Sequence, residues 1–137
     1  MKDLHNNILV SRAISPAAAT TGDTAWVSVI LDTANFSANE FVLCTGSLAD
    51  ANATFAVLLE EGAASDLSDN TAVADKNLLG TEALAAFTFA DDNETRKLGY
   101  IGVKRYIRAT VTPAANTGDA FVSAVWVQAG ARVAPQS

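Results

Sequence analysis

The sequence predicts an all-β fold, a single-domain antiparallel β-sandwich that is jelly-roll-like, with about eight strands. Short runs rich in Val, Ile, Thr and Phe follow one another, with Gly, Pro, Asn or Asp between them. Half of the 137 residues are hydrophobic and 18% are charged, which is typical of a chain with a packed core. The length suits one domain, so we expect one sandwich over 1–137, with short arms at 1–7 and 129–137.

The expected strands share β-branched or aromatic residues and end at turn residues. In chain order they are Ile8 to Ile14, Ala25 to Leu31, Glu40 to Thr45, Thr54 to Glu60, Ala85 to Phe89, Lys97 to Ile101, Arg105 to Thr112 and Ala120 to Gln128. The stretch 66–79 fits either a long loop or one or two helical turns capped by Asp69 or Asn70.

Two segments near opposite ends of the chain resemble each other. The first segment begins with Ile14-Ser-Pro-Ala-Ala, continues through Thr-Gly-Asp and ends with Trp26-Val-Ser-Val. The second begins with Val111-Thr-Pro-Ala-Ala, continues through Thr-Gly-Asp and ends with Phe121-Val-Ser-Ala-Val. Proline cannot donate to a ladder and glycine permits a turn, so we expect each segment to be a strand-turn-strand hairpin. The two hairpins should occupy related places in the two sheets.

The sequence lacks the side-chain sets that common enzyme chemistry needs. His5 is the one histidine and lies in a polar N-terminal segment, so a core Ser-His-Asp set and a multi-histidine zinc site both lack their parts. The glycines are scattered singly rather than grouped as in a phosphate-binding loop. We expect no enzymatic activity and no cofactor. Cys44 lies in an apolar run and is expected to be a small core residue, with no disulfide.

Loop carboxylates leave calcium binding open. These residues are Asp91, Asp92 and Glu94 in one turn, and Asp66, Asp69 and Asp75 in the long loop; they lack the ordered spacing of a helix-loop-helix calcium site. Most aromatic residues lie in apolar runs and are expected in the core, namely Trp26, Phe41, Phe55, Phe87, Phe89, Phe121 and Trp126. Phe36, Tyr100 and Tyr106 remain for a sugar platform, so a carbohydrate-binding module is one alternative function.

The charge balance excludes some partners. A net charge of −6 and only nine Lys and Arg residues argue against nucleic acid, because neutralising phosphates needs a dense basic surface. No apolar stretch approaches the roughly 20 residues that span a bilayer, and residues 1–7 do not resemble a secretory signal, so we expect no membrane partner.

Positive charge is concentrated in one region. Five of the nine basic residues lie between positions 96 and 108. Strand alternation from 104 onward predicts that Lys104, Tyr106 and Arg108 point outward as a protein interface, whereas a solvated strand face is the alternative. We expect such a row to contact an acidic patch on a neighbouring chain.

Several segments resemble small virion proteins of tailed bacteriophages. They are Thr95 to Gly102, Lys104 to Arg108 and Thr110 to Pro113, supported by Met1 to His5, Leu79 to Glu82 and Phe87 to Asn93. The resemblance implies a head decoration, or cement, protein that is made in the bacterial cytoplasm and lies on the outer surface of the capsid. Its implied partners are the phage major capsid protein and copies of itself, as a homodimer or homotrimer. A head-tail connector or tail protein is the alternative in the same setting.

Overall fold

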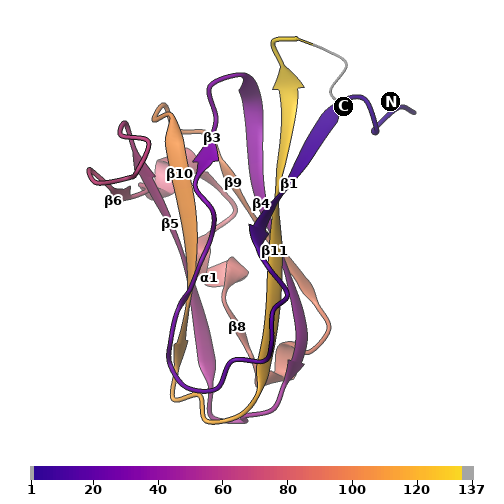
Figure 1. Cartoon of the computed structure of the whole chain (residues 1–137), viewed down its shortest axis with the longest axis vertical. Coiled ribbons are helices and arrows are strands. Elements are labelled where there is room, and N and C mark those ends of the chain that lie inside the picture. Colours follow the sequence, from indigo (N-terminus) through magenta and orange to yellow (C-terminus); the bar gives the residue numbers. More distant parts are fainter. Residues whose placement is uncertain (1, 134–137) are drawn as a thin grey trace.

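The computed structural model describes residues 2–133 as two antiparallel sheets packed face to face. Figure 1 shows the two layers side by side, with β1, β4 and β11 in one and β5 and β10 in the other. The five-stranded sheet has the order β1-β11-β4-β9-β7. The six-stranded sheet has the order β2-β10-β5-β6, with β3 added to β10 and β8 added to β5. The predicted fold class, an antiparallel jelly-roll-like β-sandwich, is confirmed.

Long strands dominate the sandwich and short ones border it. The long strands are β1 (Ile8–Ile14), β4 (Phe36–Leu48), β5 (Thr54–Gly62), β9 (Thr95–Tyr100), β10 (Tyr106–Ala114) and β11 (Ala120–Ala131). The short ones are β2 (Trp26–Val27), β3 (Leu31–Asp32), β6 (Thr71–Ala72), β7 (Leu78–Leu79) and β8 (Phe87–Thr88). The helical elements are α1 (Glu82–Ala85) and the 3₁₀ turns η1 (Asp75–Asn77) and η2 (Phe89–Asp91).

The core lies between the sheets because alternate residues of each long strand point inward. Phe41 and Trp126 come from neighbouring strands of the five-stranded sheet, with ring centroids 5.1 Å apart. Phe55 and Phe87 stack at 4.7 Å on the inner side of the other sheet. The remaining fully buried large side chains are Leu43, Leu59, Leu67, Leu98, Ile107 and Val111. All of these except Leu67 belong to one continuous core that joins both layers.

The two similar segments are not hairpins, which corrects the sequence interpretation. The first leads from β1 in the five-stranded sheet to β2 in the six-stranded sheet, and the second leads from β10 back to β11. Each strand of the first segment pairs with a strand of the second: β1 pairs with β11, and β2 pairs with β10. Pro113 lies within β10, beyond the point where β2 stops pairing at Val111, so its missing N–H removes no bond to β2.

The predicted strand Ala25 to Leu31 is divided into β2 and β3. The Ser28 hydroxyl accepts a hydrogen bond from the Ala109 amide at 2.9 Å, and the Ser28 amide donates to the Ala109 carbonyl at 2.8 Å. A side chain thus replaces a backbone carbonyl at this point of the ladder, and regular pairing stops.

Residues 66–79 form a loop with β6, η1 and β7 rather than the alternative helix. The Asp69 carboxylate accepts from the amides of Ala63 and Ala64, at 2.8 and 3.1 Å, and so does not cap a helix that follows it. The predicted strand Ala85 to Phe89 is likewise reduced to β8, because α1 and η2 occupy its two ends.

The structure describes parts of both predicted arms. Lys2 to Asn7 are exposed and precede β1. Ala129 and Ala131, which were predicted to belong to the C-terminal arm, are part of β11 and pair with Ala38 and Phe36 of β4. Residues 134–137, like Met1, lie outside the described part of the chain.

Candidate functional site

The outer side of the five-stranded sheet carries exposed apolar side chains. Val10 on β1 is 51% exposed, and Phe121 and Val125 on β11 are 43% and 36% exposed. Val42 and Val127 are half-buried on the same side. We call this surface the apolar face; it consists of Val10, Val42, Cys44, Phe121, Val125 and Val127.

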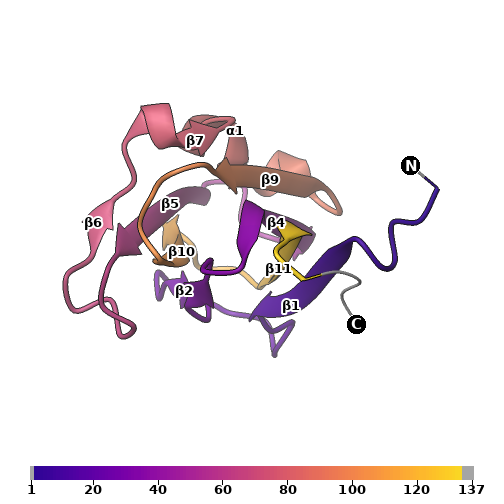
Figure 2. The same cartoon turned by 90° about the horizontal axis from the view of Figure 1, so that it is seen from above.

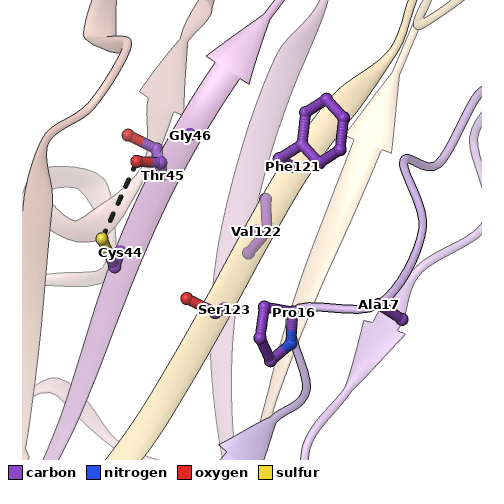
Figure 3. Close-up of a pocket in the computed structure, with 8 residues that line it drawn as sticks. All are labelled: Pro16, Ala17, Cys44, Thr45, Gly46, Phe121, Val122 and Ser123. Atoms are coloured by element: carbon purple, nitrogen blue, oxygen red, sulfur yellow. Dashed lines mark hydrogen bonds between the residues drawn. The ribbon is translucent and has the colours of Figure 1, made fainter.

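Strand register makes the apolar face continuous. Val10 lies opposite Val127, and Val125 lies opposite Val42, so apolar pairs extend across β1, β11 and β4. Cys44 lies opposite Ser123 in the next outward row. Figure 3 shows these two side chains on neighbouring strands, with Phe121 nearer the start of β11. Directly opposite side chains on one side of a sheet are in contact range, so these residues form one surface.

The hollows in this surface are shallow. Two of them share Pro16, Cys44 and Ser123 in their lining and have volumes of about 180 and 250 Å³. Sites that enclose a small molecule usually have volumes of about 300–1,000 Å³. The surface is therefore better suited to another protein surface than to a small ligand.

Charge is unevenly distributed around the apolar face. Strands β1, β4, β9 and β11 carry one acidic residue, Glu40, in a chain with 15 acids. Burial of Glu40 raises the pKa of its carboxyl group, and nearby Lys97 partly offsets this shift. Arg12, opposite Val125, and Lys97, opposite Val42, border the apolar pair. Glu40 lies opposite Val127, so the face is apolar with a mixed border of two basic residues and one acidic residue.

The structure separates the three residues of the predicted basic row. Tyr106 and Arg108 lie in β10 on the outer side of the six-stranded sheet, but Lys104 precedes the strand and lies in the loop from β9. Arg108 is opposite Glu60 of β5 and forms an ion pair with it at 2.6 Å. Arg105 pairs with Asp32 at 2.9 Å. Much of the positive charge is therefore neutralised within the chain.

These contacts predict different results for two charge reversals. Arg108→Glu would place a second carboxylate beside the half-buried Glu60, so we expect a loss of about 1.5–3 kcal/mol of unfolding free energy. Lys104→Glu, at an exposed loop position, should change it by less than about 0.5 kcal/mol. Urea unfolding of both variants measures the difference. Equal stabilities would show that the ion pair with Glu60 contributes nothing.

The acidic loops form no metal centre within residues 2–133, where no three His, Cys, Asp or Glu side chains are placed to hold an ion. Asp66 and Asp69 instead accept backbone hydrogen bonds in their own loop, from Ser68 and from Ala63 and Ala64. These bonds lower the pKa of both carboxyl groups. The absence of enzymatic activity stays a prediction.

The three aromatic residues considered for sugar binding do not form one platform. Phe36 is the first residue of β4 in the five-stranded sheet, opposite Ala131 of β11. Tyr100 is buried on the inner side of β9, where only 2% of it is exposed, whereas Tyr106 lies on the outer side of the other sheet. Arg105 covers the Tyr106 ring at 5.1 Å from its centroid.

Three predicted core residues are exposed. Cys44 and Phe121 point outward, because Leu43, Thr45 and Val122 occupy the inward positions beside them. Phe89 begins η2 and is 43% exposed. The alternation of inward and outward side chains within the runs 40–45 and 120–128 could have identified Cys44 and Phe121 as exposed. It gave no clear pattern, because apolar residues occupy both sides of these strands.

Among the described residues, no helix has the length and apolar character needed to cross a membrane.

No protein-family model and no curated protein matches the sequence. Solved structures with a similar fold include the CBM22-1–GH10 modules of Clostridium thermocellum xylanase 10B, with a TM-score of 0.47 and 9% identity over 96% of this chain and 27% of that one. Another is a chain of infectious bursal disease virus, Gx strain, with a TM-score of 0.45 and 11% identity; the match covers 93% of this chain and 33% of that one. A third is the C-terminal family 22 carbohydrate-binding module of the same xylanase, with a TM-score of 0.42 and 13% identity; the match covers 96% of this chain and 92% of that one. These likenesses concern the fold alone.

Proposed function

We propose that this chain is a non-catalytic structural protein of a tailed-phage virion, a decoration protein on the outer surface of the capsid. The observation that carries the proposal is the apolar face on β1, β11 and β4, which is too shallow for a small ligand and has no covering element among residues 2–133. The largest exposed apolar patch on a monomeric domain is often functional, and protein interaction is one of the uses of such patches.

The apolar face is proposed to bind the phage major capsid protein. Its area follows from strand geometry: three strands about 4.8 Å apart and about eight residues long give roughly 300–400 Å². Stable pairwise interfaces bury about 800 Å² per partner, so one face alone would bind weakly. Repeated attachment across a capsid lattice would compensate, because linked sites bind with higher avidity.

The basic row has a secondary role in this proposal. Arg108 is paired with Glu60, which leaves Tyr106 and the exposed loop residue Lys104 as the accessible part of the row. Attachment through the apolar face should depend little on salt, whereas attachment through Lys104 would weaken as salt rises. Salt dependence therefore separates the two surfaces.

Binding to expanded phage heads that lack this protein tests the proposal. Val125→Thr with Phe121→Thr removes apolar surface from the face while keeping β-prone residues. We expect binding to weaken at least about tenfold, which corresponds to about 1.4 kcal/mol. Sedimentation of heads with labelled protein measures the affinity.

A matched control removes equally exposed apolar groups elsewhere. Val29 is 47% exposed and Phe89 is 43% exposed, and neither belongs to the apolar face. Val29→Thr with Phe89→Thr should leave binding unchanged. Equal binding by the face variant and the wild type would exclude this face, and no binding by the wild type would exclude decoration.

A further inference from the structure

Strand β1 forms an open edge of the five-stranded sheet. Within residues 2–133 its ladder partner is β11 alone, which pairs with it from Ile8 to Ile14. Figures 1 and 2 show β1 at the border of its sheet, with its first residues directed away from the six-stranded sheet. The unpaired part of this edge ends before Ala13, because the Ala13 carbonyl accepts a hydrogen bond from the Val29 amide at 2.9 Å. Residues 8–12 are therefore the free part of the edge.

This edge differs from the other edges of the sandwich. The outermost strands β7, β2 and β6 each have two residues, a length that limits pairing with another chain. The free part of β1 has five residues and contains neither proline nor an acidic side chain. Its register irregularity, which could protect an edge, lies beyond it, between Arg12 and Ile14. Apart from Arg12 at its end, this part of the edge thus lacks the usual devices against strand addition.

The free edge offers both backbone and apolar contacts. In an antiparallel ladder alternate residues direct their N–H and C=O groups to the same side, so two or three of residues 8–12 direct both groups away from β11. Val10 is 51% exposed, and Ile8 and Leu9 are half-buried. Lys2 to Asn7, which precede the strand, are exposed, and Figure 2 shows them extending away from the sheet.

We propose that β1 pairs in antiparallel orientation with β1 of a second copy of this chain, about a two-fold axis at Val10. This register makes residues 8–12 self-complementary. Val10 faces Val10 of the second copy, Leu9 faces Ser11, and Ile8 faces Arg12. The two Arg12 side chains lie at opposite ends of the pairing, so the one charged residue of the edge does not face its own copy.

The dimer would join two copies of the apolar face. Val10 belongs to both the edge and the face, so pairing at Val10 makes one continuous sheet with the two faces side by side. A two-fold axis uses the same surface on both subunits, as in most soluble homo-oligomers. Of the homodimer and the homotrimer that the phage resemblance implies, this pairing gives the homodimer. It is tested on free protein, so its failure is distinguishable from failure to bind capsids.

Charge substitution at the axis tests the pairing. Val10→Lys would bring two lysines face to face, and Val10→Glu would do the same with two carboxylates. We expect the wild type to show a concentration-dependent monomer–dimer equilibrium in analytical ultracentrifugation, and each variant to have a dissociation constant at least about tenfold higher. An equimolar mixture of the two variants should dimerise again. Val27→Lys, at a 55% exposed position on β2, is the control and should dimerise like the wild type.

A cross-link tests the register independently of affinity. Directly opposite residues in an antiparallel pair have Cα atoms about 4.5–5.5 Å apart, which permits a disulfide. Val10→Cys in a Cys44→Ser background should form a disulfide-linked dimer on mild oxidation, and Val27→Cys in that background should not. A wild type that stays monomeric at its highest soluble concentration overturns the proposal. So does a trimer, a Val10→Lys variant that dimerises normally, or pairing of β1 with a strand of a different protein only.

Discussion

Replacing Trp126 by alanine is expected to cost about 3–5 kcal/mol of unfolding free energy, the largest loss from any single change considered. Trp126 is 1% exposed and packs against Phe41, so its removal leaves a cavity at the centre of the five-stranded sheet. Its indole N–H also donates to the Val29 carbonyl at 3.1 Å, which connects β11 to the chain between β2 and β3. Thermal and urea unfolding measure the loss.

The neighbouring residue provides the control. Val127 is half-buried on the apolar face, so Val127→Ala removes fewer buried groups and should cost less than about 1.5 kcal/mol. If the two changes were equally destabilising, Trp126 would not be a central contact between the layers.

Replacing Tyr100 by phenylalanine is expected to cost about 1–3 kcal/mol, because two partners lose a hydrogen bond in a partly buried place. The Tyr100 hydroxyl donates to Glu61 of β5 at 2.5 Å and accepts from the Lys104 amide at 2.9 Å. It therefore connects β9, β5 and the loop that leads to β10. Gly102 lies against the same ring, where a Cβ atom would come within 2.5 Å of it.

The pH dependence of stability provides a second readout for Tyr100. Burial, and then the hydrogen bond to Glu61, raise the pKa of its hydroxyl above the ordinary value. The unfolded chain ionises first, near pH 10, so this contribution is complete below about pH 10 and is lost as the pH rises toward the folded-state pKa. Tyr100→Phe should remove that part of the alkaline loss of stability. A wild-type slope retained in Tyr100→Phe would assign the loss to other groups.

The sequence predicted the architecture better than the connections. Val, Ile and Phe in short runs identified the long strands, and β1 has the predicted bounds. The connections were not predicted, because pairing of β1 with β11 and of β2 with β10 joins residues about a hundred positions apart. Turn residues such as Gly22 and Gly118 show where the chain bends, but they do not show which sheet it enters next.

Predicting the candidate site required knowing the direction of the side chains more than the residue types. Alternation from Tyr106 to Thr112 placed Arg108 outward, but pairing with Glu60 on β5 could not be read from the sequence. Cys44, Phe121 and Val125 were interpreted as core or not singled out, because β4 and β11 have apolar residues on both sides. An apolar outer face and an apolar inner face give the same composition, and only the fold distinguishes them.

The amount of this protein in purified virions tests the central claim most directly. A decoration protein covers the capsid surface, so quantitative mass spectrometry should find it in a molar amount comparable with that of the major capsid protein. Treatment that strips the outer surface should release it while the heads stay closed. A trace amount typical of a single connector ring or a few tail fibres, or absence from the particle, would contradict the account.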